Sequence, residues 1–102
     1  MGLASDMNEA LAADARLFIL RELEGQTDGR LNAILMQRLL ATRYGVDRSR
    51  EWVETQLRKL AELGAIELLE SALLIAEITR AGRDHVAKRS IVAGITRPTE
   101  IE

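Results

Sequence analysis

The sequence predicts one small domain of the α+β class, mostly α-helical, with a single short β-hairpin. Of its 102 residues, 47% are hydrophobic and 29% are charged, which is typical of a folded globular domain. The single proline, Pro98, stands near the C-terminus, which favours a helix-rich body. Two short apolar runs between residues 65 and 78 lack a helical period and supply the expected hairpin.

The first helix is expected over residues 9–24, where apolar residues recur at spacings of three and four. The run from Leu17 to Leu20 is apolar almost all around the helix. Such a helix requires cover on two sides. In a chain of this length, the second cover is expected to be another subunit.

The second and third helices are expected to form a helix-turn-helix pair. Asn32 is suited to cap the start of the second helix, and Gly45 is suited to end it in a left-handed conformation. Ser49 is expected to cap the third helix and Gly64 to close it. The expected buried cluster takes apolar residues from all elements: Ile19, Leu23, Leu35, Leu39, Val53, Leu57, Leu60, Ile66 and Ile78.

Strands are expected at residues 65–69 and 73–78, joined by three residues. Thr79 is suited to cap a fourth helix that runs to about Arg89, although Gly82 weakens it.

These elements define a domain over residues 9–89. Residues 1–8 are expected to form an N-terminal tail. Residues 90–102 have no helical period, and they are expected to form an extended C-terminal tail that lies over the surface or over a partner.

Charge is sorted into blocks, although the net charge is only −2. Residues 29–59 carry seven basic and three acidic residues, and residues 80–97 carry five basic residues and one acidic residue. Residues 1–28 and 60–79 are acidic. Nearly all of the basic residues are arginine, whose planar guanidinium forms forked hydrogen bonds with phosphate.

Several function classes are excluded by what the sequence lacks. Without cysteine there is no disulfide framework, cysteine zinc site or thiol catalysis. Enzyme motifs are missing, so we expect no catalytic residues and no cofactor. His85, the only histidine, has no partners at ligand spacing, so we expect no metal and a structural or solvated role. No apolar run approaches the length of a membrane span and no signal sequence is present, so a cytoplasmic location is expected.

The order of elements resembles that of a winged helix domain. Residues 49–66, SREWVETQLRKLAELGAI, resemble a recognition helix that runs into the first wing strand. Residues 76–82, AEITRAG, resemble the strand-to-helix junction of MarR-like and ArsR-like regulators. Residues 92–98, VAGITRP, resemble the closing motif of small winged helix proteins carried by Mu-like phages and prophages.

This resemblance covers residues 11–98. It implies a winged helix-turn-helix fold with a three-helix core, a hairpin wing, a C-terminal helix and an extended tail. It also implies a DNA-linked role inside a bacterial host cell. The cysteines of metal-sensing ArsR proteins are absent, so metal sensing is not implied.

The third helix is the predicted DNA-contacting element. Val53, Leu57 and Leu60 are expected to face inward, so the polar side of the helix faces out, with its N-terminal end toward base edges in the major groove. Trp52 is expected to fill the space between this helix and the hairpin. Arginine can pair with guanine or hold phosphate, and serine or threonine can contact either. The predicted DNA-binding residues are Arg38, Arg43, Arg48, Ser49, Arg50, Thr55 and Arg58.

An alternative function stays open because acids accompany these bases. Glu51 and Glu54 lie on the outward face and can pair with Arg50 and Arg58. The hairpin tip, residues 70–72, is acidic, whereas DNA-binding wings usually carry basic residues. The main prediction is a phage or prophage transcriptional regulator that binds duplex DNA as a homodimer. The alternative is a structural or assembly adaptor that binds another phage protein.

The homodimer is predicted from apolar residues that one small core cannot cover. Strand side chains alternate, so Leu74 and Ala76 can face the core while Leu73 and Ile75 point away. Their cover is expected to be the tail of the same chain or a second subunit, and exchange of the tail between subunits is one arrangement. The predicted interface residues are Leu11, Leu17, Phe18, Leu73, Ile75, Ile91, Val92 and Ile95.

Overall fold

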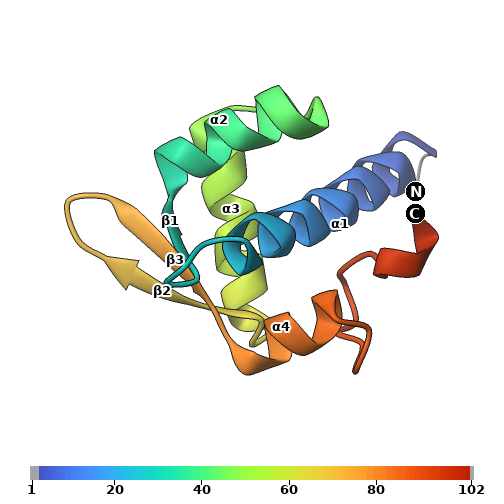
Figure 1. Cartoon of the computed structure of the whole chain (residues 1–102). Helices are drawn as coiled ribbons and strands as arrows, with labels where there is room; N and C mark the ends of the chain where they lie inside the picture. Colours follow the sequence, from blue (N-terminus) through green and yellow to red (C-terminus); the bar gives the residue numbers. More distant parts are fainter. Residues whose placement is uncertain (1–2, 102) are drawn as a thin grey trace.

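The computed structural model describes residues 3–101, in which four α-helices pack together and a small antiparallel sheet lies at one end of them (Figure 1). The helices are α1 (Leu3–Glu24), α2 (Ala33–Tyr44), α3 (Arg50–Glu62) and α4 (Arg80–Val86). The strands are β1 (Arg30–Asn32), β2 (Ile66–Glu70) and β3 (Leu74–Ile78), and one turn of 3-10 helix, η1 (Pro98–Glu100), follows in the tail.

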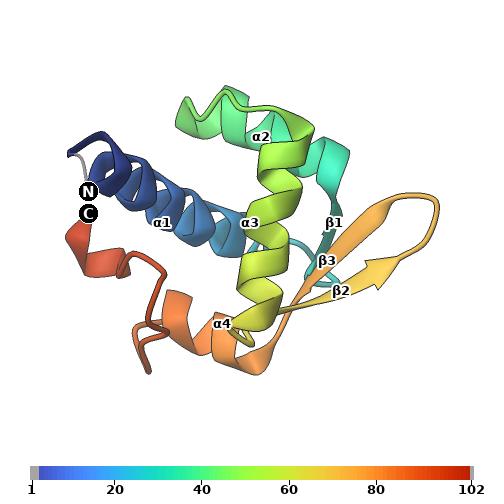
Figure 2. The same ribbon diagram turned by 180° about the vertical axis from the view of Figure 1, so that it is seen from behind.

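α1 is the central element of the fold and contacts α2, α3, α4 and β3. The hairpin of β2 and β3 projects from one end of the molecule, and the N-terminal end of α1 lies at the other (Figure 1). Seen from behind, α3 crosses in front of α1, and the long side of α3 that faces the viewer is not covered by another helix or strand (Figure 2).

The predicted helix caps are confirmed. Asn32, Ser49 and Thr79 each accept a hydrogen bond from the backbone N–H three residues further on, at 2.9, 3.1 and 3.2 Å. Gly45 and Gly64 follow α2 and α3 with φ angles of 70° and 80°, the left-handed conformation that glycine adopts without steric cost.

Two helix boundaries differ from the prediction. α1 begins at Leu3 instead of residue 9, so most of the predicted N-terminal tail is helical, and one more turn and a half is added to the helix. α4 ends at Val86 instead of Arg89, because the chain turns at Lys88, whose φ is 66°. The C-terminal tail then folds back toward α1.

The sheet has a third strand that was not predicted. Its order is β1-β3-β2, so β3 is central and pairs antiparallel with both neighbours. β1 is only three residues long, too short to show an alternating pattern. Residues 71–73 form the hairpin connection, so Leu73 lies in the loop and not in the strand as expected.

The core confirms most of the predicted cluster but corrects the phase of α2. Leu35 is 39% exposed and Leu39 is only half-buried, whereas the buried stripe consists of Ala33, Met36 and Leu40. Both stripes have helical spacing, and the packing of α2 on α1 selects the second. The other predicted members are buried in one cluster: Ile19, Leu23, Val53, Leu57, Leu60, Ile66 and Ile78.

The C-terminal tail is tied to α1 and α4 of its own chain. The backbone N–H of Val92 donates to Nδ1 of the buried His85 at 3.0 Å, so Nε2 carries the hydrogen and donates to the carbonyl of Thr96 at 2.9 Å. Arg16, only 5% exposed, donates to the carbonyl of Gly94 at 2.8 Å. The structural role predicted for His85 is therefore confirmed: it fastens the tail.

Within residues 3–101, no helix combines the length and the apolar character that a membrane crossing requires.

Candidate nucleic-acid interface

α3 presents a polar side to solvent, as the periodicity predicted. The three residues expected to face inward are buried, and Arg50, Thr55 and Arg58 are exposed. Gln56 is buried as well, because its Oε1 accepts a hydrogen bond from Nε of Arg16 at 3.0 Å. The sequence reasoning missed this polar link between α1 and α3, because its partners are forty residues apart.

Three of the five predicted arginines have glutamate partners. These pairs are Arg43 with Glu22 (3.5 Å), Arg50 with Glu54 (3.7 Å) and Arg58 with Glu70 (3.1 Å). All three arginine side chains are more than half exposed, so the pairs with Glu54 and Glu70 add little stability and a phosphate can exchange for those two carboxylates, whereas the carboxylate of Glu22 is only 9% exposed. They nevertheless reduce the positive charge of the outward face.

Arg38 and Arg48 are exposed, and the described part of the chain provides no acidic partner for either. The guanidinium carbon of Arg48 lies 5.1 Å from the centroid of the Trp52 ring, a cation–π contact. Gln37, next to Arg38 in α2, donates from Nε2 to the carbonyl of Arg48 at 3.0 Å. Arg48 therefore belongs to the junction of α2 and α3, and Arg38 lies on the exposed side of α2.

The hydroxyl groups of Ser49 and Thr55, both predicted to contact DNA, differ in whether their hydrogen is free to donate. Oγ of Ser49 accepts the capping hydrogen bond from the N–H of Trp52, so the hydroxyl hydrogen remains for a phosphate or a base. The hydroxyl of Thr55 donates to the carbonyl of Glu51 at 3.0 Å. Ser49 is thus the better placed of the two as a donor.

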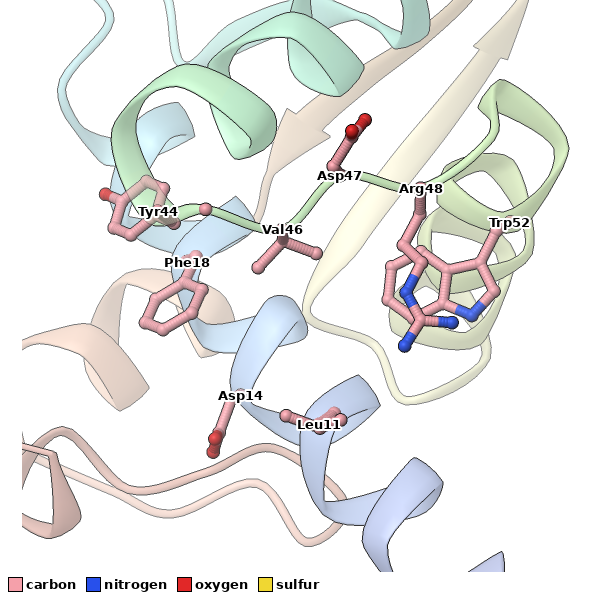
Figure 3. Close-up of a pocket in the computed structure, with 9 residues that line it drawn as sticks. Leu11, Asp14, Phe18, Tyr44, Val46, Asp47, Arg48 and Trp52 are labelled. Carbon is pink, nitrogen blue, oxygen red and sulfur yellow. The ribbon is translucent and has the colours of Figure 1, made fainter. Parts of the chain in front are cut away.

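A groove of about 350 Å³ lies between α1, the α2–α3 connection and the start of α3 (Figure 3). Trp52 contributes to this groove, so its expected place between α3 and the hairpin is wrong. The reason is its position one residue before the inward-facing Val53, which turns the indole toward α1. The lining residues are Leu11, Asp14, Phe18, Tyr44, Gly45, Val46, Asp47, Arg48 and Trp52.

One end of this groove is formed by stacked aromatic rings. The rings of Phe18 and Tyr44 lie 4.4 Å apart between centroids and 12° from parallel. The hydroxyl of Tyr44 donates to Oε2 of Glu22 at 2.8 Å. Burial, followed by this hydrogen bond and the charge of Glu22, raises the pKa of Tyr44 to about 12, so the phenol stays neutral at physiological pH.

The predicted dimer interface is wrong for Leu17 and Ile95, because the chain itself buries them. Leu17 and Ile95 are buried in the core, and Phe18 and Val92 are partly buried against it. The second cover that α1 requires comes from the tail of the same chain, together with α4. Six predicted interface residues remain at least partly accessible: Leu11, Leu73 and Ile91, which are exposed, and Phe18, Ile75 and Val92, which are half-buried.

The outer face of the sheet carries uncovered apolar side chains. Ile75 in β3 stands opposite Leu69 in β2 and lines a shallow hollow with Leu35 of α2. Leu69 and Leu35 are 37% and 39% exposed, and Leu73 in the adjoining loop is 39% exposed. We call Leu35, Leu69, Leu73 and Ile75 the outer-face patch.

Comparison of the chain with protein-family models, curated proteins and solved structures gives no match. Within the described residues, no three histidine or acidic side chains are grouped so that they could hold a metal ion. The function is therefore argued from the α3 surface, the groove and the outer-face patch.

Proposed function

We propose that this chain is a winged helix protein that binds duplex DNA through α3 and acts as a homodimeric transcriptional regulator of a phage or prophage. Three helices followed by a hairpin support the fold, with α2 and α3 as the helix-turn-helix and β2–β3 as the wing. The pairing of β1 with β3 joins the wing to the start of α2.

The observation that carries the proposal is Arg48, an exposed arginine without an acidic partner among the described residues, directly before the N-cap of α3, with a second such arginine, Arg38, on α2. A helix N-terminus presents free N–H groups and a partial positive charge, which attract phosphate. Ser49 lies at this end and keeps its hydroxyl hydrogen available. The uncovered side of α3 gives a duplex access to it (Figure 2).

These residues divide into two roles. Arg38 and Arg48 hold phosphates and set the register of α3 on the duplex. Ser49 and Arg50, at the first turn of α3, reach base edges in the major groove. Arg58, paired with Glu70 of the hairpin, contributes less because that carboxylate must first be displaced.

Arg38→Ala and Arg48→Ala are expected to weaken duplex binding, because each removes a phosphate contact. Each substitution should also reduce the slope of log affinity against log salt by about 0.9. The measurement is fluorescence anisotropy of a labelled mixed-sequence duplex across a salt series. Arg80→Ala is the matched control, because Arg80 is exposed and starts α4, beyond the opposite end of α3 (Figure 2). Absence of duplex binding by the wild type at low salt would reject the proposal.

Arg16 is unsuitable as a control, although it is not among the predicted DNA-binding residues. Its guanidinium is buried and bonded to Gln56, Glu9 and the tail. Its removal would leave buried polar groups without partners and destabilise the fold, which would lower DNA binding for a reason unrelated to contact.

A second candidate function is a structural or assembly adaptor of a phage. The acidic hairpin with its apolar outer-face patch favours this reading, because an uncovered apolar surface marks an interaction site. The duplex-binding measurement decides between the two, since an adaptor would show no salt-dependent affinity for DNA.

The proposed homodimer is assigned to the outer-face patch, because α1 is covered by its own chain. Light scattering at micromolar concentration should give twice the chain mass of 11.3 kDa. Leu69→Asp combined with Leu73→Asp should give the single-chain mass, because the two carboxylates would be desolvated at the interface. Leu11→Asp, also at an exposed leucine, should leave the dimer intact. A monomeric wild type would contradict the homodimer.

A further inference from the structure

We propose that the groove between α1 and the start of α3 binds a small aromatic carboxylate or sulfonate, with the ring among Leu11, Phe18 and Val46 and the anionic group on Arg48. Such a ligand would compete with DNA for Arg48. This competition rests on the proposed function, whereas the ligand site does not.

The groove has the size and lining of a small-molecule site. Its volume of about 350 Å³ lies near the lower end of the roughly 300–1,000 Å³ common for such sites, which suits one or two fused rings. Leu11, Phe18, Val46 and Trp52 point toward the same space from three parts of the chain (Figure 3). The Phe18–Tyr44 stack fixes one wall, so much of the apolar surface is formed before a ligand enters.

Arg48 gives the groove its preference for an anion. The guanidinium carbon lies 5.1 Å from the centroid of the Trp52 ring, a cation–π contact, and its N–H groups can form a forked hydrogen bond with a carboxylate. No acidic side chain among the described residues pairs with it.

The two carboxylates that line the groove do not oppose this preference. Asp47 points away from the space enclosed by the apolar residues (Figure 3). Asp14 is turned toward the C-terminal tail, where Oδ1 accepts a hydrogen bond from the hydroxyl of Thr96 at 2.5 Å. Arg48 is therefore the charged group that meets the ligand.

A bound anion would oppose DNA binding because one guanidinium serves both. Arg48 immediately precedes the N-cap residue of α3, and its backbone is held to α2 by Gln37. When a ligand carboxylate occupies the edge of the guanidinium, that edge is unavailable to a phosphate. Ligand binding would thus shift the chain toward its DNA-free state.

Trp52 makes the test direct, because it is the only tryptophan of the chain and lies in the groove. The probe is 8-anilinonaphthalene-1-sulfonate, followed by energy transfer from Trp52. Its neutral counterpart is N-phenyl-1-naphthylamine, which has the same rings without the sulfonate. The wild type is expected to bind the anionic probe at least about tenfold more tightly than the neutral one, because only the anion bonds to Arg48.

Arg48→Gln is expected to lower the affinity for the anionic probe about tenfold and to change the affinity for the neutral probe less than about twofold. Arg80→Gln is the matched control, because Arg80 is exposed and does not line the groove; it should change neither affinity. Unfolding curves of both variants verify that each is folded. Equal affinity for the two probes, or an anionic affinity unaffected by Arg48→Gln, would overturn the ligand site.

Competition is measured separately, by titrating the anionic probe into wild type bound to labelled duplex. Release of the duplex at saturating probe is expected. Simultaneous binding of probe and duplex would overturn the competition while leaving the ligand site. Failure of the wild type to bind duplex in the absence of probe would overturn the proposed function, and the affinities of the two probes would then decide the ligand site alone.

Discussion

Leu57→Ala is expected to lower the free energy of unfolding by about 2–5 kcal/mol. Leu57 is fully buried in the core cluster, on the helix that contacts α1, α2 and β2. Removing three carbon atoms there loses burial and leaves a cavity that these elements cannot close without moving. The measurement is urea unfolding followed by circular dichroism, with the midpoint and slope fitted for wild type and variant.

Leu69→Ala is the matched control, since it deletes the same atoms from a leucine that is 37% exposed on β2. Its cost should stay below about 1 kcal/mol, as for other surface substitutions. Equal costs at the two positions would mean that α3 does not face the core through Leu57. The inferred outward direction of Arg50 and Arg58 would then fail as well.

Helix ends were predictable from the sequence because their chemistry is local. An N-cap side chain bonds to an N–H three residues further on, so Asn32, Ser49 and Thr79 carry their signal within one turn. Gly45 and Gly64 likewise act on the turn that precedes them. The same argument does not extend to α1, whose N-terminal extension to Leu3 has no comparable cap signal in the sequence.

The phase of α2 was not predictable because the sequence offers two apolar stripes. Leu35 and Leu39 are as hydrophobic as Met36 and Leu40, and both pairs have helical spacing. The choice depends on how β1 leads into the helix and how α2 packs on α1. The packing contacts join residues that are distant in the sequence. Tertiary packing of this kind overrides local preference.

The outward position of the arginines on α3 was predictable from the sequence, but most of their ion-pair and ring contacts were not. The inward stripe of α3 correctly placed the arginines outside, and the spacing of Arg50 and Glu54 correctly indicated a pair. The link from Arg58 to Glu70 depends on where the hairpin folds. The contact of Arg48 with Trp52, which connects the start of α3 to the groove, depends on the path of the α2–α3 connection.

The second cover of α1 shows why an apolar excess does not by itself predict a dimer. Leu17 needed a partner, as its surroundings in the sequence indicated, but Ile95 of the tail belongs to the same cluster and Val92 packs against it. Hydrogen bonds to His85 and Arg16 bring the tail back. These partners lie seven and 78 residues apart in the sequence and do not follow a helical period, so no periodicity could reveal them.

Gly82→Ala is expected to destabilise the fold by an amount at or above the upper end of the roughly 1–3 kcal/mol typical of overpacking. An added Cβ would collide with the backbone carbonyl of Ala65 and lie 2.8 Å from Cγ1 of Ile78. The carbonyl of Ala65 cannot withdraw, because it accepts the N–H of Thr79 at 3.0 Å. Helix propensity alone predicts the opposite sign, a gain of about 1 kcal/mol for alanine over glycine.

The matched control for this substitution is Gly25→Ala, where the nearest atoms to an added Cβ lie 3.6 Å away. That variant should unfold at a temperature equal to or slightly above that of the wild type, since alanine restricts the unfolded chain more than glycine does. Thermal unfolding of the two variants therefore compares the same substitution with and without a steric clash of the added Cβ. A rise in stability for Gly82→Ala would show that α4 does not pack on the turn between α3 and β2, and that the junction from β3 into α4 is held in some other way.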